Sequence, residues 1–301
     1  MSSVESNKRS LSAKARARLA DRVRLIAKLC HHMEKTGRCS RAIVHELRRA
    51  CRAAEAAAWL LSSADRPKFE KFRTKLKRLR RRAGAVRDID VAGTVLKSLA
   101  SSPSLRRDVP RVRDSLRKKR RERVERLLAF LRKHPRGGIP AAADALKGVS
   151  RSLGDAGVVR SLRALDARVR RLAATGPRSI GAIHTLRIAG KRALLAGEIV
   201  RPTPRECNPL AVLVDQIGRL LDLEVALALA TELLSELASE RAAGRGTEQG
   251  NKGSRSNSQL QAIRPQLLFA TLRRLARIEK SQAIALCEAL DRPRSRRGSV
   301  Q

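Results

Sequence analysis

The sequence of 301 residues predicts an all-α fold. Ala, Leu, Arg and Lys dominate its composition, and these residue types favour helices. Apolar residues recur at i, i+3 and i+4, whereas the alternating pattern typical of strands is nearly absent. Only 18 Gly and 11 Pro interrupt this pattern. A β-sandwich or a doubly wound sheet is therefore excluded.

Capping residues mark the first two helices. An apolar stripe runs from Leu19 to Met33, and Gly37 is expected to end the first helix because glycine adopts the left-handed conformation required there. Ser40 is expected to cap the second helix. The first two helices are therefore predicted at residues 10–35 and 40–61.

Three further helices are expected before a clear interruption. Pro67 suits the first turn of a helix, and Gly84 is expected to end it. The sequence His-Pro-Arg-Gly-Gly-Ile-Pro at 134–140 cannot continue a helix, so it is the expected boundary between two lobes. These helices are predicted at residues 65–84, 86–99 and 110–133.

The second half of the chain is also expected to be helical. The helices are predicted at residues 140–152, 157–174, 178–200, 206–220, 222–240 and 265–290. Residues 244–258 are rich in Gly, Ser, Asn and charge, which is typical of a mobile loop. We expect residues 1–9 to be flexible and residues 291–301 to form a disordered basic tail.

The charge of the chain restricts its partners. It has 67 Lys and Arg against 28 Asp and Glu, a formal net charge of +39. Such self-repulsion destabilises a compact state unless an anion screens it. The charge therefore predicts a nucleic acid, an inorganic polyanion or an anionic surface as partner.

Cysteine content and hydropathy indicate a cytoplasmic protein. The five Cys are odd in number and contain no CxxC pair, which argues against a disulfide framework and a thiolate zinc site. We see neither a signal-peptide pattern nor a run of about 20 apolar residues that would span a membrane.

An internal repeat places basic residues on two helices. AIVHELRRACRA contains His45, and AIHTLRIAGKRA contains His184; each His is followed by Leu two positions on, Arg three on and a basic residue seven on. Downstream, GAVRDIDVAGTVL and IGRLLDLEVALAL align Asp88 with Asp222. The chain is therefore expected to contain two copies of one helical unit.

The repeated residues suit phosphate. Positions +3 and +7 lie about 60° and 20° from the histidine around a helix, so each copy forms one polar stripe. Arg grips phosphate oxygens with a planar fork of donors, Lys adds a mobile charge, and His adds a further donor. Like charges this close repel one another, so an anion between them is expected.

These motifs resemble the CHAD domain, the conserved histidine α-helical domain. The resemblance rests on HxxRxxxR beginning at His45 and HxxRxxxKR beginning at His184, and it covers residues 10–290. It implies two pseudo-symmetric helical-bundle lobes, residues 10–134 and 140–290, around a basic central cavity. It also implies binding of inorganic polyphosphate and association with polyphosphate granules.

The predicted ligand set combines the repeat with the basic segment 66–82, where ten of seventeen residues are Lys or Arg. The set is His45, Arg48, Arg49, Arg52, Lys75, Arg78, Arg82, His184, Arg187, Lys191 and Arg192. The resemblance places the family's acidic pair at Asp88 and Asp90, with Asp222 in the second copy. The chain departs from the family pattern at Ala53, Glu55, Leu194 and Leu195.

We expect no catalytic residue, metal site or cofactor. His45-Glu46 begins an HExxH pattern, but position 49 is Arg. Cys30 and the neighbouring histidines match no common zinc spacing, and Cys30 fits the apolar stripe. GTEQGNKGS follows no strand, which argues against a phosphate-binding loop. Asp88 and Asp90 have the ligand type for Mg²⁺, although a helix-stabilising role is favoured.

Three functions compete at this point. The main hypothesis is non-enzymatic binding of inorganic polyphosphate. The principal rival is non-specific binding to a duplex nucleic-acid backbone; single-stranded recognition is disfavoured because the chain has no Tyr and one Trp, Trp59. A metal-dependent phosphohydrolase using Asp88 or Asp90 is the third.

Overall fold

The computed structural model describes residues 10–62, 66–99, 108–147, 154–177, 179–200, 208–245 and 265–291. All the regular structure within these ranges is helical, which confirms the all-α prediction. The α-helices are α1 (Leu11–Thr36), α2 (Arg41–Leu60), α3 (Arg66–Leu99), α4 (Asp108–Lys133), α5 (Ile139–Lys147), α6 (Asp155–Ala174), α7 (Ile180–Val200), α8 (Pro209–Arg245) and α9 (Pro265–Asp291); a short 3₁₀ helix, η1 (Pro135–Gly138), precedes α5.

The capping residues predicted for α1 and α2 act as expected. The Ser10 hydroxyl accepts a hydrogen bond from the Ala13 N–H at 3.2 Å, and the Ser40 hydroxyl accepts one from Ile43 at the same distance. Gly37 ends α1 with a φ of 64°, and its N–H donates to the Met33 carbonyl. Local sequence alone therefore sets these helix ends.

Two predicted helix breaks are wrong. Gly84 does not end a helix, because α3 continues through it to Leu99, and the two helices predicted around residue 221 are the single helix α8. Buried side chains on both sides of each predicted break, including Leu79 and Val86 in α3 and Leu220 and Ala226 in α8, pack into the core. This burial stabilises each helix as one piece.

Other predicted segments lie partly outside the described residues. Helix α8 extends to Arg245, two residues into the predicted loop 244–258, and the rest of that loop is not described. The predicted flexible residues 1–9 and tail residues 292–301 also lie outside the described part. Helix α5 is described only as far as Lys147, short of the predicted end at residue 152.

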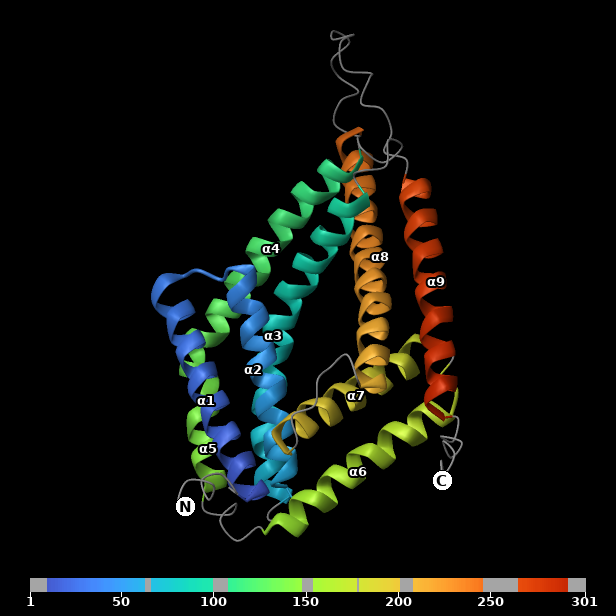
Figure 1. Cartoon of the computed structure of the whole chain (residues 1–301). Coiled ribbons are helices and arrows are strands. Elements are labelled where there is room, and N and C mark those ends of the chain that lie inside the picture. The colour runs from blue at the N-terminus through green and yellow to red at the C-terminus, as the bar shows by residue number, and fades with distance from the viewer. Residues whose placement is uncertain are drawn as a thin grey trace, which may run out of the picture.

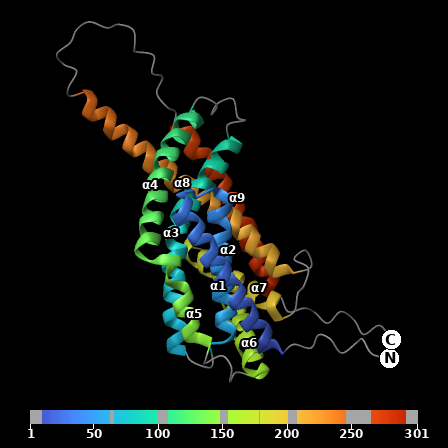
Figure 2. The same ribbon diagram turned by 90° about the vertical axis from the view of Figure 1, so that its left-hand side faces the viewer.

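Helices α1 to α5 form one group and α8 and α9 another; α3 packs directly against α8, and α6 packs on α7 and α9 (Figures 1 and 2). Helices α1 to α5 pack together at the N-terminal side, α8 and α9 lie side by side, and α7 packs against both α2 and α8. One apolar core contains side chains from both groups, among them Leu47, Leu79, Leu186 and Ile217. A second cluster, including Leu96, Leu116, Leu233 and Leu272, joins the far ends of α3, α4, α8 and α9.

Cysteine positions and hydropathy agree with a core of ordinary apolar packing. The four described cysteines, Cys30, Cys39, Cys51 and Cys287, are free and buried, so the core position predicted for Cys30 is confirmed. No helix among the described residues has the length and apolarity needed to cross a membrane.

Candidate anion-binding site

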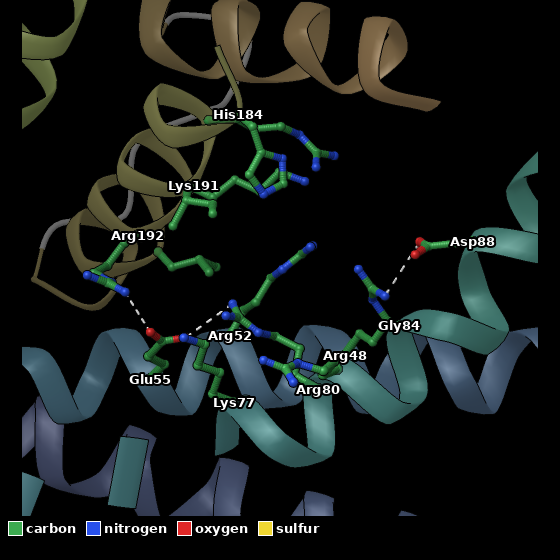
Figure 3. A pocket seen from close by; sticks show the side chains of 14 residues that line it. Arg48, Arg52, Glu55, Lys77, Arg80, Gly84, Asp88, His184, Lys191 and Arg192 are labelled. Carbon is green, nitrogen blue, oxygen red and sulfur yellow. Dashed lines mark hydrogen bonds and ion pairs between the residues drawn. The ribbon is translucent and has the colours of Figure 1, made fainter. Parts of the chain in front are cut away.

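A cavity of about 340 Å³ lies between α2, α3 and α7 (Figure 3). Its walls carry far more cations than anions. They are formed by Arg48, Arg52, Glu55, Lys77, Arg80, Arg81, Gly84, Asp88, His184, Arg187, Ile188, Lys191, Arg192 and Leu195.

Helix α2 supplies one wall because its two faces differ. Arg48, Arg52 and Glu55 lie within about 60° of one another around the helix and line the cavity. Another face is fully buried in the core through residues such as Leu47 and Ala54, as the sequence pattern predicts. Core packing on one side therefore fixes the basic stripe on the other.

Helix α7 supplies the facing wall with His184, Arg187, Lys191 and Arg192. Its close packing on α8 depends on Gly190, where an added Cβ would lie 2.6 Å from the Val214 Cγ2 atom. The glycine thus lets α7 approach α8 while its basic side faces the cavity.

Helix α3 completes the site with Lys77, Arg80, Arg81 and Asp88. Gly84 lies on the same face, and a Cβ there would be 2.5 Å from the Arg48 Nη1 atom. This glycine was predicted to end a helix. It lies instead in the middle of α3 and leaves room beside the helix for the Arg48 guanidinium group. The contact explains why glycine is present in the middle of α3 despite its low helix propensity.

The structure brings together six of the predicted ligands: Arg48, Arg52, His184, Arg187, Lys191 and Arg192. Five others do not line the cavity: His45, Arg49, Lys75, Arg78 and Arg82. The three in α3 lie about 100° to 160° around the helix from Lys77, on a solvent-facing side. Arg49 is exposed and pairs with Glu46 at 3.4 Å.

Carboxylates partly neutralise the two ends of the cavity. At one end, Glu55 forms ion pairs with Arg80 at 3.2 Å and with Arg192 at 2.5 Å. At the other end, the Arg48 Nη1 atom lies 3.8 Å from the Asp88 Oδ1 atom. Figure 3 shows Arg52 and Lys191 between these ends.

The central cations have no such partners. Within the described residues, Arg52 and Lys191 form no ion pair with a carboxylate. The Nε atoms of Arg48 and Arg187 are buried and have no hydrogen-bond acceptor there. Buried donors without acceptors are costly, so this site is suited to an anionic ligand that supplies several oxygen atoms.

Comparison with known proteins identifies the family at this point. The family model described as "CHAD domain" matches residues 23–231, more than half of the chain. The chain belongs to the CHAD family. A crystal structure of the CHAD domain from the plant Ricinus communis has a similar fold, with a TM-score of 0.66 and 18% identity, covering 93% of this chain and 92% of that chain. No curated protein matches the chain in sequence.

Burial, and after it the crowding of cations, lowers the pKa values of several cavity residues in this CHAD chain. Burial, and then Arg48 and Arg187, lower the pKa of Arg52 to about 9. Burial and the same Arg187 lower the pKa of Lys191 to about 7. The pKa of His184 is also lowered, by burial and Arg187. A bound anion would reverse these shifts, because it favours the charged forms.

The acidic residues that the family resemblance singled out are separated. Asp90 is buried and accepts from the Arg120 Nε atom at 2.7 Å, outside the cavity. Asp222 accepts from Arg87 at 3.2 Å. Burial raises the pKa of Asp88. Among the described residues, no group of three His, Cys, Asp or Glu side chains could hold a metal ion.

Lys77, Arg80 and Arg81 line the cavity but were absent from the predicted ligand set. Their neighbours in the sequence are equally basic, so composition could not distinguish the two faces of α3. The apolar residues Leu76, Leu79 and Ala83 together with Gly84 could have indicated the inward face, had the helix been extended through the glycine.

Proposed function

We propose that this CHAD protein binds inorganic polyphosphate in the cavity between α2, α3 and α7. The observation that carries this proposal is the central group of cations, Arg52, Arg187 and Lys191, which converge from two helices; among the residues that the structure describes, no carboxylate forms an ion pair with Arg52 or Lys191. A polyphosphate segment would place several negative charges and many acceptor oxygens among them. The proposed role is binding without catalysis.

Each helix would contribute a different kind of contact. The buried Nε–H groups of Arg48 and Arg187 would donate to phosphate oxygens, as guanidinium groups do in bidentate pairs. Lys191 would act as a point charge, and His184 would become protonated beside the ligand. A linear polyanion suits this row of donors because adjacent phosphates can engage adjacent side chains.

A repeated local contact supports the pseudo-symmetric lobes that the family resemblance implies. Arg48 of α2 packs over Gly84 of α3, and Arg187 of α7 packs over Gly218 of α8, where an added Cβ would lie 3.4 Å from the Arg187 Nη2 atom. The two arginines hold equivalent positions in the sequence repeat. We therefore place the polyphosphate path at the junction of two related helical units.

Duplex nucleic acid is the rival ligand, because the outward faces of α3 and α4 are rich in exposed arginine and lysine. A cavity of about 340 Å³ cannot admit a duplex, so nucleic acid would bind outside it. The two ligands therefore require different residues.

In the cell, we propose that the protein is cytoplasmic and associates with polyphosphate granules.

The deciding experiment compares two double variants with equal loss of charge. Arg48→Ala/Arg187→Ala removes cavity residues, whereas Arg78→Ala/Arg82→Ala removes exposed residues on the other face of α3. Long-chain polyphosphate affinity is measured by titration near physiological salt, with helical content checked by circular dichroism. A duplex DNA competitor is titrated in parallel.

We expect the cavity variant to lose roughly 100-fold in affinity, since each charge-assisted contact is worth about 1.5–3 kcal/mol. The exposed control should lose much less, because solvent screens its charges. Equal losses in the two variants, or tighter binding to duplex DNA than to polyphosphate, would contradict the proposal.

A further inference from the structure

Glu55 is a buried carboxylate in the wall of a cavity suited to anions. Its side chain is 7% exposed and contacts three arginines, Arg73, Arg80 and Arg192. The contacts come from α3 and α7, so the carboxylate lies where two helices converge on α2. A charge this deeply buried requires such partners to offset its desolvation.

Two of these arginines face the cavity. Arg80 and Arg192 both line it, whereas Arg73 does not. Each directs an N–H group at Glu55 that could otherwise donate to a phosphate oxygen. The Arg192 guanidinium is also held in place by Trp59, with its Cζ atom 5.1 Å from the indole centroid. Arg192 therefore cannot easily turn away from the carboxylate.

The opposite end of the cavity lacks this arrangement. Asp88 is 43% exposed, and its nearest ion pair, with Arg48, is 3.8 Å long. Arg48 also retains a buried Nε–H without an acceptor. The cations at that end thus keep free donor capacity, while those around Glu55 are already paired with an oxygen anion.

We propose, on the basis of the proposed function, that Glu55 is an internal anion that occupies one phosphate position in the polyphosphate path. In the free protein it neutralises Arg80 and Arg192 and stabilises the fold. On binding, it limits the number of phosphate groups that the cavity engages, because the ligand must end or turn at the carboxylate. Glu55 is therefore a residue that sets specificity by competing with the ligand.

The test is Glu55→Gln, with Glu70→Gln as the matched control. Glu70 also pairs with Arg73, at 2.9 Å, but it is 42% exposed and does not line the cavity. Each substitution removes one carboxylate charge that pairs with Arg73. Affinity for long-chain polyphosphate is measured by titration at several salt concentrations, and stability by urea unfolding of the free protein.

We expect Glu55→Gln to bind polyphosphate about tenfold more tightly, equivalent to about 1.4 kcal/mol. The log–log salt dependence should steepen by about 0.7 to 0.9, by analogy with one more phosphate contact to a nucleic acid. The free variant should unfold at lower urea, because three arginines lose a common partner. Glu70→Gln should change none of these strongly, and Glu55→Asp should restore the wild-type affinity.

Unchanged or weaker binding by Glu55→Gln would overturn this inference, because removal of a carboxylate that competes with the ligand must tighten binding. Arg187→Ala separates that outcome from failure of the proposed function. A loss of affinity in Arg187→Ala without a gain in Glu55→Gln rejects only the role of Glu55, whereas no loss in Arg187→Ala rejects the cavity as the binding site.

If Glu55→Gln does not fold, the same titration on Glu55→Gln/Arg73→Ala removes one of the stranded cations. Its reference is Arg73→Ala alone, which retains the carboxylate. We expect the double variant to bind polyphosphate more tightly than this reference, and equal or weaker binding would again overturn the inference.

Discussion

Two groups of buried charges in this protein differ in their balance of sign. Around Asp90, the carboxylate accepts a hydrogen bond from Arg120 at 2.7 Å and forms an ion pair with Arg41 at 3.1 Å, and Arg120 also donates to the Cys39 carbonyl at 2.8 Å. Around Arg52, by contrast, the described structure places Arg187 and Lys191 but no ion-paired carboxylate. Both groups are rich in arginine, yet only in the first do protein oxygens pair with the arginines.

The difference indicates how to separate structural arginines from those that we propose bind a ligand, in a chain of net charge +39. Arginines that complete their hydrogen bonds on protein oxygens connect separate segments, as Arg120 of α4 connects to Asp90 of α3 and to the carbonyl of Cys39 between α1 and α2. Arginines that remain crowded against other cations raise the free energy of the free protein, and an anion lowers it again. The two groups should therefore respond in opposite ways to mutation.

The largest expected effect is on the balanced group. Arg120→Ala should lower the free energy of unfolding by about 3 kcal/mol, because it removes the closer partner of a buried carboxylate. Arg117→Ala is the control, since its pair with Asp114 is exposed and should contribute less than about 1 kcal/mol. Urea unfolding measures both. Polyphosphate affinity should remain unchanged in Arg120→Ala, and a marked loss would show that the two groups are coupled.

The second expected effect is stabilisation by the ligand. Polyphosphate at a hundredfold excess over its dissociation constant should raise the free energy of unfolding by about 2.7 kcal/mol. At that same concentration Arg52→Ala should gain less, because its affinity is lower, whereas Arg120→Ala should gain the full amount. Thermal unfolding with and without polyphosphate measures this. An identical gain in Arg52→Ala and the wild type would contradict the importance of the unbalanced group.

The third expected effect is a pH dependence of binding. Lys191, with a pKa of about 7, is largely neutral in the free protein above that pH, and a bound polyanion raises the pKa again. Binding therefore takes up a proton, and affinity should fall by up to about tenfold per pH unit as the pH rises above 7.

Titration calorimetry in buffers of different ionisation enthalpy measures this proton uptake. Lys191→Met should flatten the dependence above pH 7, leaving the contributions of His184, whose pKa is also lowered, and of Arg52 as the pH approaches 9. A wild-type affinity independent of pH between 7 and 9 would mean that Lys191 does not contact the ligand.

The smallest expected effect compares two glycines on α3. A Cβ at Gly84 would lie 2.5 Å from the Arg48 Nη1 atom, whereas one at Gly93 would lie 3.8 Å from the Arg41 Nη2 atom. Both alanine variants should gain up to about 1 kcal/mol of helix propensity, offset at Gly84 by displacement of Arg48. Only Gly84→Ala should weaken polyphosphate binding. Equal affinities of the two variants, measured by titration, would show that the position of Arg48 is unimportant.

The sequence predicted most of the fold because local signals specify it. Ser10, Gly37 and Ser40 mark helix ends through side-chain and backbone hydrogen bonds that involve near neighbours only. The apolar stripe of α2 likewise predicts which side enters the core. Gly84 gave the wrong result because a glycine that ends a helix and a glycine that admits a distant side chain look alike in sequence.

For the site, the repeated motif identified several cavity-facing residues of α2 and α7, including Arg52, Arg187 and Lys191, but it also included His45, which does not line the cavity. The motif does not extend to α3. There, Lys75 and Lys77 are the same residue type and differ only in the face of the helix on which they lie. The ion-pair partners were also hidden, since Glu55 meets Arg192 across 137 positions of sequence.

The sequence by itself determined the helical class, the helix caps, the excess of positive charge and the repeated basic motif, because each depends on residue type and short-range spacing. Only the tertiary structure decided which cations converge and which are neutralised. Convergence depends on how α2, α3 and α7 pack, and neutralisation depends on carboxylates such as Glu55 and Asp90 that meet their arginines only after folding. The electrostatic interaction between two charges depends on their distance in space, which their separation along the chain does not reveal.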